Sequence, residues 1–149
     1  GLGSAIEQGI KNCKLKYVGI QACDMSDDIK DLKKYYKIIS TENLDAIFGS
    51  RFVSGTIVKD YPLIKLILNR IFNNIVRVLF FTKYNDFTNG FKMYNRTTLK
   101  KLLPIVSENF NVFLEIPLKI ISRKYSYKTI PINYYNRMIG VSKFMREQI

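Results

Sequence analysis

The 149 residues suffice for one globular domain, and a hydrophobic content of 47% with 24% charged residues excludes a disordered chain. The net charge of +12 favours a polyanionic partner, namely phosphates, an anionic membrane surface or nucleic acid. The sequence contains no histidine, which excludes a histidine base and an imidazole metal ligand.

The charge and the cysteines give two further indications. Residues 1–50 hold equal numbers of lysines and acids, so the whole positive excess lies in residues 51–149. Cys13 and Cys23 form no C-x-x-C pair, which favours a reducing, cytosolic compartment. No signal peptide is visible and the sequence starts at Gly1 without a methionine. We therefore expect an incomplete piece of a longer protein.

Residues 1–50 alternate between helical and strand-like patterns. Apolar residues at helical spacing predict helices over 4–14 and 28–39, and short apolar runs predict strands over 17–23 and 45–49. This order predicts α/β architecture with a parallel sheet. Two strands are too few for a stable sheet, so further strands are expected elsewhere in the protein.

Acidic residues gather after the first predicted strand, at Asp24, Asp27, Asp28 and Asp31. Open α/β sheets bind ligands at the carboxyl ends of their strands, and carboxylate oxygens are preferred Mg²⁺ ligands. Asp27 and Asp28 also fall in the expected first turn of a helix, where acids are stabilised by free N–H groups. That position favours a structural role for these two and a functional role for Asp24.

The remaining elements follow a loop over 52–60. Pro62 opens a predicted helix that reaches residue 82, with polar residues on one stripe and apolar residues on the rest. Two interpretations stay open, a helix in the membrane interface and a buried core helix with a thin wet edge. Further along we expect a turn at 86–91, strands at 91–94 and 127–135, helices at 97–103 and 112–123, and a loop at 136–149. Pro131 suggests an edge or a bulge in the last strand.

Several basic residues are candidates for a phosphate site. Arg51 follows the second predicted strand and is expected at the same sheet edge as Asp24. The residues that could join it are Lys59, Arg70, Arg137 and Lys143. A scattered, solvated surface is the alternative. Asp86, before Gly90, could act in the site or simply cap a turn.

Taken together, these segments resemble the family 2 glycosyltransferases that load sugars onto polyprenyl phosphates, the dolichol-phosphate mannosyltransferase type. The resemblance covers nearly the whole chain and follows the family order. The matching pieces are GLGSAIEQGI (1–10), CDMSDD (23–28), LDAIFGSRF (44–52), Asn69-Arg70, DFTNGFKMY (86–94), FLEIPLK (113–119) and IPINYYNRMIGVSKF (130–144).

The resemblance implies that 1–149 is a single partial GT-A domain, the metal and acceptor portion of such an enzyme. Asp24 matches the last acid of the family's D-x-D motif and, with Asp27 and Asp28, would hold Mg²⁺ or Mn²⁺ against the donor diphosphate. Asp86 matches a position near the reacting sugar and is, with Asp24 and Arg51, a candidate catalytic residue. The residues matching basic positions that face the acceptor phosphate are Arg51, Arg70, Arg137 and Lys143.

The implied function is inverting transfer of a hexose from a nucleotide sugar, of the GDP-mannose or UDP-glucose type, to a polyprenyl or dolichyl phosphate. Helix 62–82 would meet the lipid, and the protein would lie peripherally on the cytoplasmic face of a membrane. The chain departs from the pattern at Ala22, which replaces the first D-x-D acid, and in lacking the family's two opening βα units. We therefore expect no activity from this segment alone.

The alternative is a non-catalytic module, derived from such an enzyme, that docks on anionic membranes through helix 62–82. Nucleic acid is not an expected partner, because no RNP-like or helix-turn-helix pattern is present.

Overall fold

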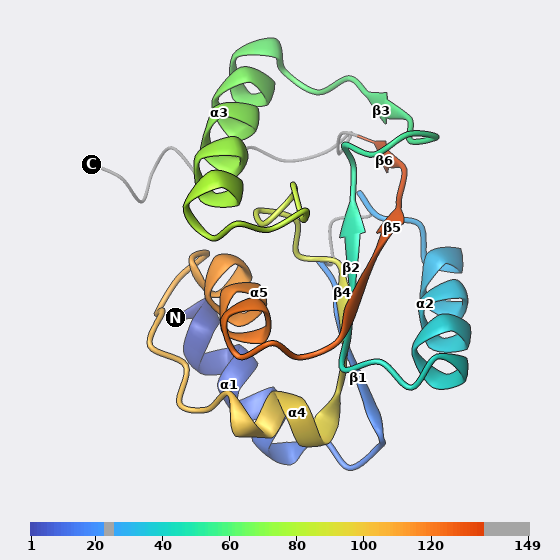
Figure 1. Cartoon of the computed structure of the whole chain (residues 1–149), viewed down its shortest axis with the longest axis vertical. Coiled ribbons are helices and arrows are strands. Elements are labelled where there is room, and N and C mark those ends of the chain that lie inside the picture. The colour runs from blue at the N-terminus through green and yellow to red at the C-terminus, as the bar shows by residue number, and fades with distance from the viewer. Residues whose placement is uncertain (23–25, 136–149) are drawn as a thin grey trace.

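A mixed sheet with helices on both faces forms the centre of the molecule (Figure 1). The structure, a computed structural model, describes residues 1–22 and 26–135. The helices are α1 (Leu2–Asn12), α2 (Lys30–Thr41), α3 (Leu63–Leu79), α4 (Arg96–Lys101) and α5 (Val112–Ser122). The strands are β1 (Tyr17–Ile20), β2 (Ala46–Ser50), β3 (Val58–Lys59), β4 (Lys92–Asn95), β5 (Tyr127–Pro131) and β6 (Tyr134–Tyr135).

The main sheet has the strand order β1-β4-β2-β5. β4 pairs antiparallel with both β1 and β2, whereas β5 pairs parallel with β2. The prediction of a parallel sheet is therefore wrong for β4, although β1, β2 and β5 all run the same way. The helix between β1 and β2 makes these two strands parallel but leaves room between them, and β4 returns from the turn before it to fill that gap.

The last predicted strand is split in two, a second difference from the sequence-based expectation. β5 ends at Pro131 as an edge strand of the main sheet, in agreement with the edge position that Pro131 suggested. β6 leaves that sheet and pairs with β3, a short strand inside the predicted loop 52–60. This second sheet lies beyond the carboxyl end of β2 (Figure 1).

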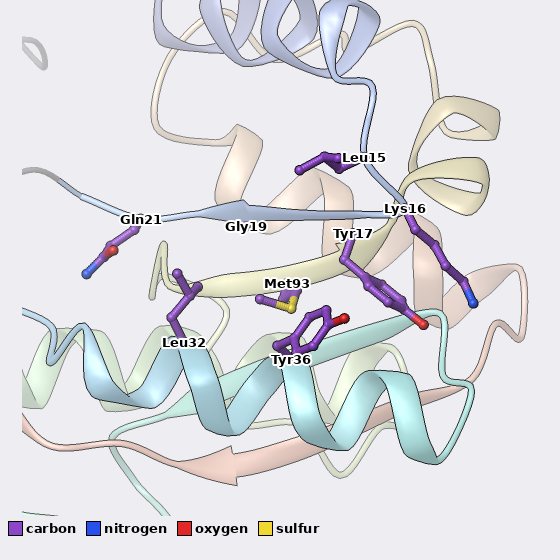
Figure 2. A pocket seen from close by; sticks show the side chains of 8 residues that line it. All are labelled: Leu15, Lys16, Tyr17, Gly19, Gln21, Leu32, Tyr36 and Met93. Atoms are coloured by element: carbon purple, nitrogen blue, oxygen red, sulfur yellow. The ribbon is translucent and has the colours of Figure 1, made fainter.

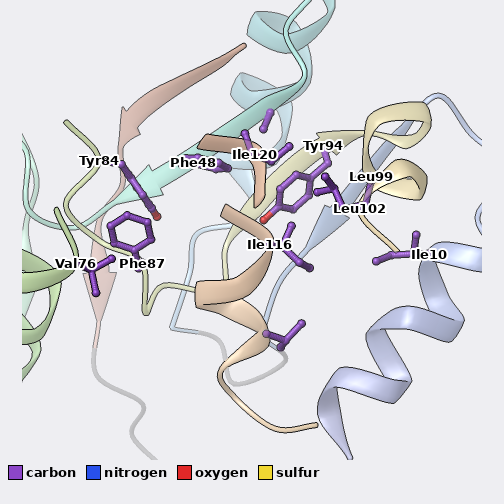
Figure 3. Packing of buried hydrophobic residues seen from close by; sticks show 12 residues of the cluster. Ile10, Phe48, Val76, Tyr84, Phe87, Tyr94, Leu99, Leu102, Ile116 and Ile120 are labelled. Atoms are coloured by element: carbon purple, nitrogen blue, oxygen red, sulfur yellow. The ribbon is translucent and has the colours of Figure 1, made fainter. Parts of the chain in front are cut away.

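Side chains of the central strands alternate between two hydrophobic clusters. Ala46, Phe48 and Tyr94 belong to the cluster under α1, α4 and α5 (Figure 3). Ile47 and Met93 belong to the cluster under α2. This alternation is the two-residue period of a strand that is covered on both faces.

Helix α3 packs against the fold through its polar stripe and Val76, while most of its apolar residues take no part in the packing. Asn73 is fully buried, and its amide oxygen accepts a hydrogen bond from the backbone N–H of Phe87 at 2.6 Å. Its amide group also donates to the backbone oxygen of Asn69 at 2.8 Å. This arrangement contradicts the buried-core interpretation of the helix.

Most apolar residues of α3 face outward. We use the name α3 apolar surface for the exposed side chains of Leu63, Ile64, Ile67, Leu68, Ile71, Phe72, Ile75, Val78, Leu79, Phe80 and Phe81. No helix in the described ranges is both long enough and apolar enough to cross a bilayer.

Glu115 on α5 fastens the loop that precedes this helix. Its carboxylate accepts hydrogen bonds from the backbone N–H groups of Val106 (2.9 Å) and Ser107 (2.7 Å) and pairs with Lys119 at 2.6 Å. Partial burial raises the pKa of Glu115, but the hydrogen bonds from Lys119 and Ser107 outweigh it and lower the pKa to about 2. The carboxylate thus stabilises the fold above its ordinary pKa of 4.5, and this stabilisation is lost as the pH falls towards 2.

We expect Glu115→Gln to lower the free energy of unfolding at pH 7 by about 1.5–3 kcal/mol, the range for hydrogen bonds to a charged group. The difference from the wild type should shrink below pH 4.5, where the carboxylate of the unfolded chain begins to take up a proton while that of the folded chain, with its pKa of about 2, does not. Urea denaturation at pH 7 and pH 3 measures both values. The control is Glu42→Gln, which breaks the exposed pair with Lys128 and should cost less than about 1 kcal/mol. Equal losses at the two pH values would contradict this role of Glu115.

Candidate functional site

A buried ion pair joins the end of β2 to the turn 86–91. The Arg51 guanidinium donates to both oxygens of the Asp86 carboxylate, from Nε at 2.9 Å and from Nη2 at 2.7 Å. The backbone N–H of Arg51 donates to the same carboxylate at 2.9 Å, and Nη2 also donates to Thr88 at 3.0 Å. Asp86 is fully buried and Arg51 is 7% exposed. This geometry makes the pair bidentate and rigid.

The Asp86 carboxylate stabilises the charged form of Arg51. Burial alone would lower the pKa of Arg51, but the Asp86 carboxylate outweighs it and raises that pKa above its usual range. The two charges cancel, so Arg51 does not present a free positive charge to a ligand. Any net charge at this edge therefore comes from its neighbours.

The backbone of β2 shapes the site. The carbonyl oxygen of Gly49 accepts hydrogen bonds from the Tyr84 hydroxyl and from the Asn89 side-chain amide, each at 3.1 Å. A side chain at Gly49 would collide with the Tyr35 hydroxyl, with Ile132 and with the carbonyl of Phe91. Glycine here allows the turn to approach β2 closely, which brings Asp86 within reach of Arg51.

Aromatic rings and a second arginine surround the pair. The Arg51 guanidinium lies 5.3 Å from the ring centres of Phe52 and Tyr134 and 5.6 Å from that of Tyr61. Arg70 from α3 lies 4.4 Å from the ring centre of Phe52 and donates to the backbone oxygen of Asn85 at 3.2 Å. Arg70 therefore adds a partly buried positive charge beside the neutral pair.

The acidic segment reaches the same edge through β6. Asp27 forms an isolated antiparallel bridge with Tyr134, whose ring also faces Arg51. Asp28 is exposed, and one of its oxygens accepts the backbone N–H of Lys30 at 2.9 Å, at the start of α2. This matches the helix-start role considered for Asp28. Asp24, Arg137 and Lys143 lie outside the described residues.

The predicted metal site includes Asp24, which lies outside the described residues. Within 1–22 and 26–135, no three His, Cys, Asp or Glu side chains gather in a way that could hold a metal ion. The carboxylates of Asp27 and Asp28 nevertheless supply the oxygen donors that Mg²⁺ and Mn²⁺ prefer, and Mg²⁺ needs only one or two of them beside substrate phosphates.

Lys92 is a buried charged residue that the sequence analysis did not single out. It lies on β4 in the DFTNGFKMY segment, 1% exposed, with its ammonium under the turn 86–91. The available signal was a lysine at the start of a short strand that is otherwise apolar, Lys92 to Tyr94. A charge in such a run indicates either a surface strand or an internal partner.

An open cavity of about 500 Å³ lies apart from the ion pair, between β1 and α2. Figure 2 shows Leu32, Tyr36 and Met93 around it, with Tyr17 and Lys16 at one end. Its lining is mainly apolar and contains no carboxylate. The cavity follows the outer strand of the sheet, so we place the candidate site at the ion pair and not here.

Comparison with known proteins shows the family to which the chain belongs. The model of the family "Glycosyl transferase family 2" matches residues 1–103. The chain therefore belongs to glycosyl transferase family 2, and its mixed α/β architecture is a partial GT-A fold. The resemblance to family 2 glycosyltransferases, found from the sequence, is confirmed for the family.

Two curated proteins are similar to this chain. It is 30% identical over 107 residues to the polyprenol monophosphomannose synthase of Mycolicibacterium smegmatis, a match that covers 70% of this chain and 40% of that protein. It is 28% identical over 137 residues to an uncharacterized protein of Methanocaldococcus jannaschii, with 89% and 56% covered. The chain spans about half the length of these relatives.

Proposed function

We propose that the chain is the metal-facing and acceptor-facing part of an enzyme that transfers a hexose from a nucleotide sugar to a polyprenyl or dolichyl phosphate. The observation that carries this proposal is the place of the Arg51–Asp86 pair. It lies at the sheet edge under the polar stripe of α3, while the opposite side of α3 exposes the α3 apolar surface. A charged site beside a helix suited to the membrane interface fits an acceptor with a phosphate head and a lipid tail. The name of the Mycolicibacterium smegmatis relative supports the same acceptor class.

The proposed reaction needs no histidine. A phosphate monoester oxygen is already anionic at pH 7, so the acceptor can attack the anomeric carbon of the sugar without a protein base. As the new bond forms, the bond from that carbon to the diphosphate breaks, and the nucleoside diphosphate leaves with the bonding electrons. This single displacement inverts the anomeric centre. The protein aligns the two substrates and neutralises their charge.

The described residues suggest a division of roles. Arg70, partly buried beside the pair, is the candidate to contact the acceptor phosphate, together with Arg137 and Lys143. Arg51 holds Asp86 in place beside the reacting sugar, and direct contact of Arg51 with phosphate stays a prediction. A guanidinium bound on one side by a carboxylate still offers further N–H groups, so the two roles are compatible.

Asp24, Asp27 and Asp28 would hold the Mg²⁺ or Mn²⁺. When bound, the ion would neutralise charge on the leaving diphosphate. Asp27 approaches the site through its bridge with Tyr134. One carboxylate oxygen of Asp28 accepts a hydrogen bond from the backbone N–H of Lys30 at the start of α2.

We expect Asp24→Asn, made in the protein expressed from its complete reading frame, to lower transfer at least roughly 100-fold, because a metal on the leaving group contributes several kcal/mol to the transition state. The control is Asp60→Asn, an exposed residue with φ of 57°, a backbone conformation that asparagine also accepts. Near-normal turnover of Asp24→Asn would contradict the role of Asp24.

The proposal itself is tested by measuring transfer from GDP-mannose and from UDP-glucose to a polyprenyl phosphate, with and without EDTA. Lipid-linked sugar that disappears with EDTA is the expected result. No product from either donor, from folded protein bound to vesicles, would contradict the enzyme and favour a second candidate.

That second candidate is a non-catalytic module that docks on anionic membranes. The exposed α3 apolar surface, together with Lys65, Arg70 and Arg77 on the same helix, favours it independently of any chemistry. A docking module would bind any anionic vesicle equally, whereas the enzyme should prefer vesicles that contain polyprenyl phosphate. In either case we propose a peripheral location on the cytoplasmic face of a membrane.

A further inference from the structure

Lys92 is a buried cation in mainly apolar surroundings. Its neighbours across the sheet are Ile20 on β1 and Phe48 on β2, and its side chain enters the space beside the rings of Tyr84 and Phe113. The ring centres lie 5.9 Å and 6.0 Å from Nζ. An ammonium in such surroundings is costly unless it is hydrogen-bonded.

Backbone carbonyls supply those hydrogen bonds. Nζ donates to the carbonyl oxygens of Phe87 (3.2 Å) and Asn89 in the turn 86–91, and to that of Phe113 (3.5 Å) on α5. The ammonium thus joins the turn to the first part of α5. A neutral side chain of the same length would fill the space without making these contacts.

The turn that Lys92 holds is the one that carries Asp86. The N–H of Asn89 donates to the backbone oxygen of Asp86 at 3.3 Å, and the N–H of Phe91 donates to the Asn89 side chain at 3.0 Å. The hydrogen bonds from Lys92 to the carbonyls of Phe87 and Asn89 therefore restrain the segment between Asp86 and the start of β4. Arg51 has to meet an Asp86 carboxylate whose position is set by this segment.

The charge of Lys92 also acts on the pair. Burial and the nearby Arg51 lower the pKa of Lys92, to about 7, while Asp86 opposes the shift. A second buried cation beside the neutral Arg51–Asp86 pair gives this cluster a net positive charge whenever Lys92 is protonated. An anionic substrate at the sheet edge would be favoured by that charge.

We propose that Lys92 is a positioning residue of the site: its ammonium holds the turn 86–91 so that Asp86 stays in bidentate contact with Arg51. This inference rests on the proposed function only for the role of the site in sugar transfer. The restraint itself is a property of the folded chain and can be measured without any substrate.

The test compares Lys92→Met with the wild type by amide hydrogen exchange and by the NMR signal of the Arg51 Nε–H. We expect exchange in the turn 86–91 to become roughly 10-fold to 100-fold faster, the range for loss of hydrogen bonds to a charged group. The Arg51 Nε–H resonance should shift, while the amides of α1 and α2 keep their protection. Lys128→Met is the control, because Lys128 is exposed on β5 and pairs with Glu42.

Three outcomes would overturn the proposal. They are unchanged exchange in the turn, an unchanged Arg51 signal, and equally faster exchange throughout the chain, which would make Lys92 a general core residue. If Lys92→Met does not fold, the proposal is tested instead on the wild-type protein, by the NMR signal of its Lys92 Nζ group. A slowly exchanging Lys92 Nζ signal with contacts to Phe87 and Asn89 supports the proposal, and a rapidly exchanging one overturns it.

Activity gives a separate readout in the protein expressed from its complete reading frame. We expect Lys92→Met to lower kcat by roughly 10-fold to 100-fold, as for small misplacements of a reacting group, with the KM for the donor unchanged. An unchanged kcat would overturn the positioning role. If even the wild type transfers no sugar, the proposed function fails. The hydrogen-exchange experiment still tests the positioning role of Lys92, because it needs no substrate.

Discussion

Asp86→Asn is expected to destabilise the fold by about 3–5 kcal/mol, the cost of leaving a buried charge without its partner. The substitution keeps the shape of the side chain but removes the charge that balances Arg51, which is 7% exposed. It also turns an oxygen that accepts from the Arg51 guanidinium at 2.7 Å or 2.9 Å into an NH₂ donor. Urea denaturation gives the free energy of unfolding, and the slope of the transition shows whether unfolding stays two-state.

The double variant Arg51→Met/Asp86→Asn isolates the ion pair. It removes both charges, while the remaining amide oxygen at position 86 can still accept the backbone N–H of residue 51, which now bonds the carboxylate at 2.9 Å. We expect the double variant to recover at least about half of the stability lost in Asp86→Asn, because replacing both buried charges is often neutral. If Asp86→Asn changes the free energy of unfolding by less than about 1 kcal/mol, the pair does not have the buried character described above.

Leu68→Glu/Ile71→Glu is expected to weaken binding to anionic vesicles by roughly 100-fold, because each side chain loses about 1.5 kcal/mol of apolar burial. Leu68 is 62% exposed and Ile71 is 52% exposed, three positions apart on the α3 apolar surface. Both face away from the stripe through which Asn73 packs, so the stability of the fold should stay nearly unchanged. Vesicle sedimentation and thermal unfolding measure the two effects.

The matched control is Gln8→Glu/Thr97→Glu, which adds the same two negative charges at exposed positions on α1 and α4. This variant should bind vesicles almost as well as the wild type. Equal weakening by both variants would show that charge alone drives binding, and unchanged binding of the α3 variant would remove this helix from the membrane contact.

Local patterns predicted most of the elements, because they depend on neighbouring residues. The apolar spacing of α1, α2 and α5 and the short runs of β1, β2 and β4 are visible without knowledge of the fold. The errors concern which strands and helices are neighbours in the folded chain. A short strand such as β4 carries no sign of its partners, and its insertion between β1 and β2 follows from the path of the chain after α3.

The α3 helix shows the limit of the helical pattern most clearly. Its polar stripe and apolar remainder were predicted, but the pattern fitted a core helix and an interface helix equally well. Only the fold shows that Asn73 is buried and that the apolar side points outward. The reason is that the turn presents the backbone N–H of Phe87 to α3, and the Asn73 side chain can accept a hydrogen bond from it whereas an apolar side chain cannot.

Patterns in the amino-acid sequence were enough to predict the family, the helical and strand-forming segments, and the candidate residues of the site. Only the folded structure reveals that Arg51 pairs with Asp86, 35 positions away, and that the Lys92 ammonium donates hydrogen bonds to backbone carbonyls of the turn 86–91. Composition shows which charges exist, but whether a charge is free, paired or buried depends on contacts between segments distant in the chain. Those contacts form only when the sheet and its turns are assembled.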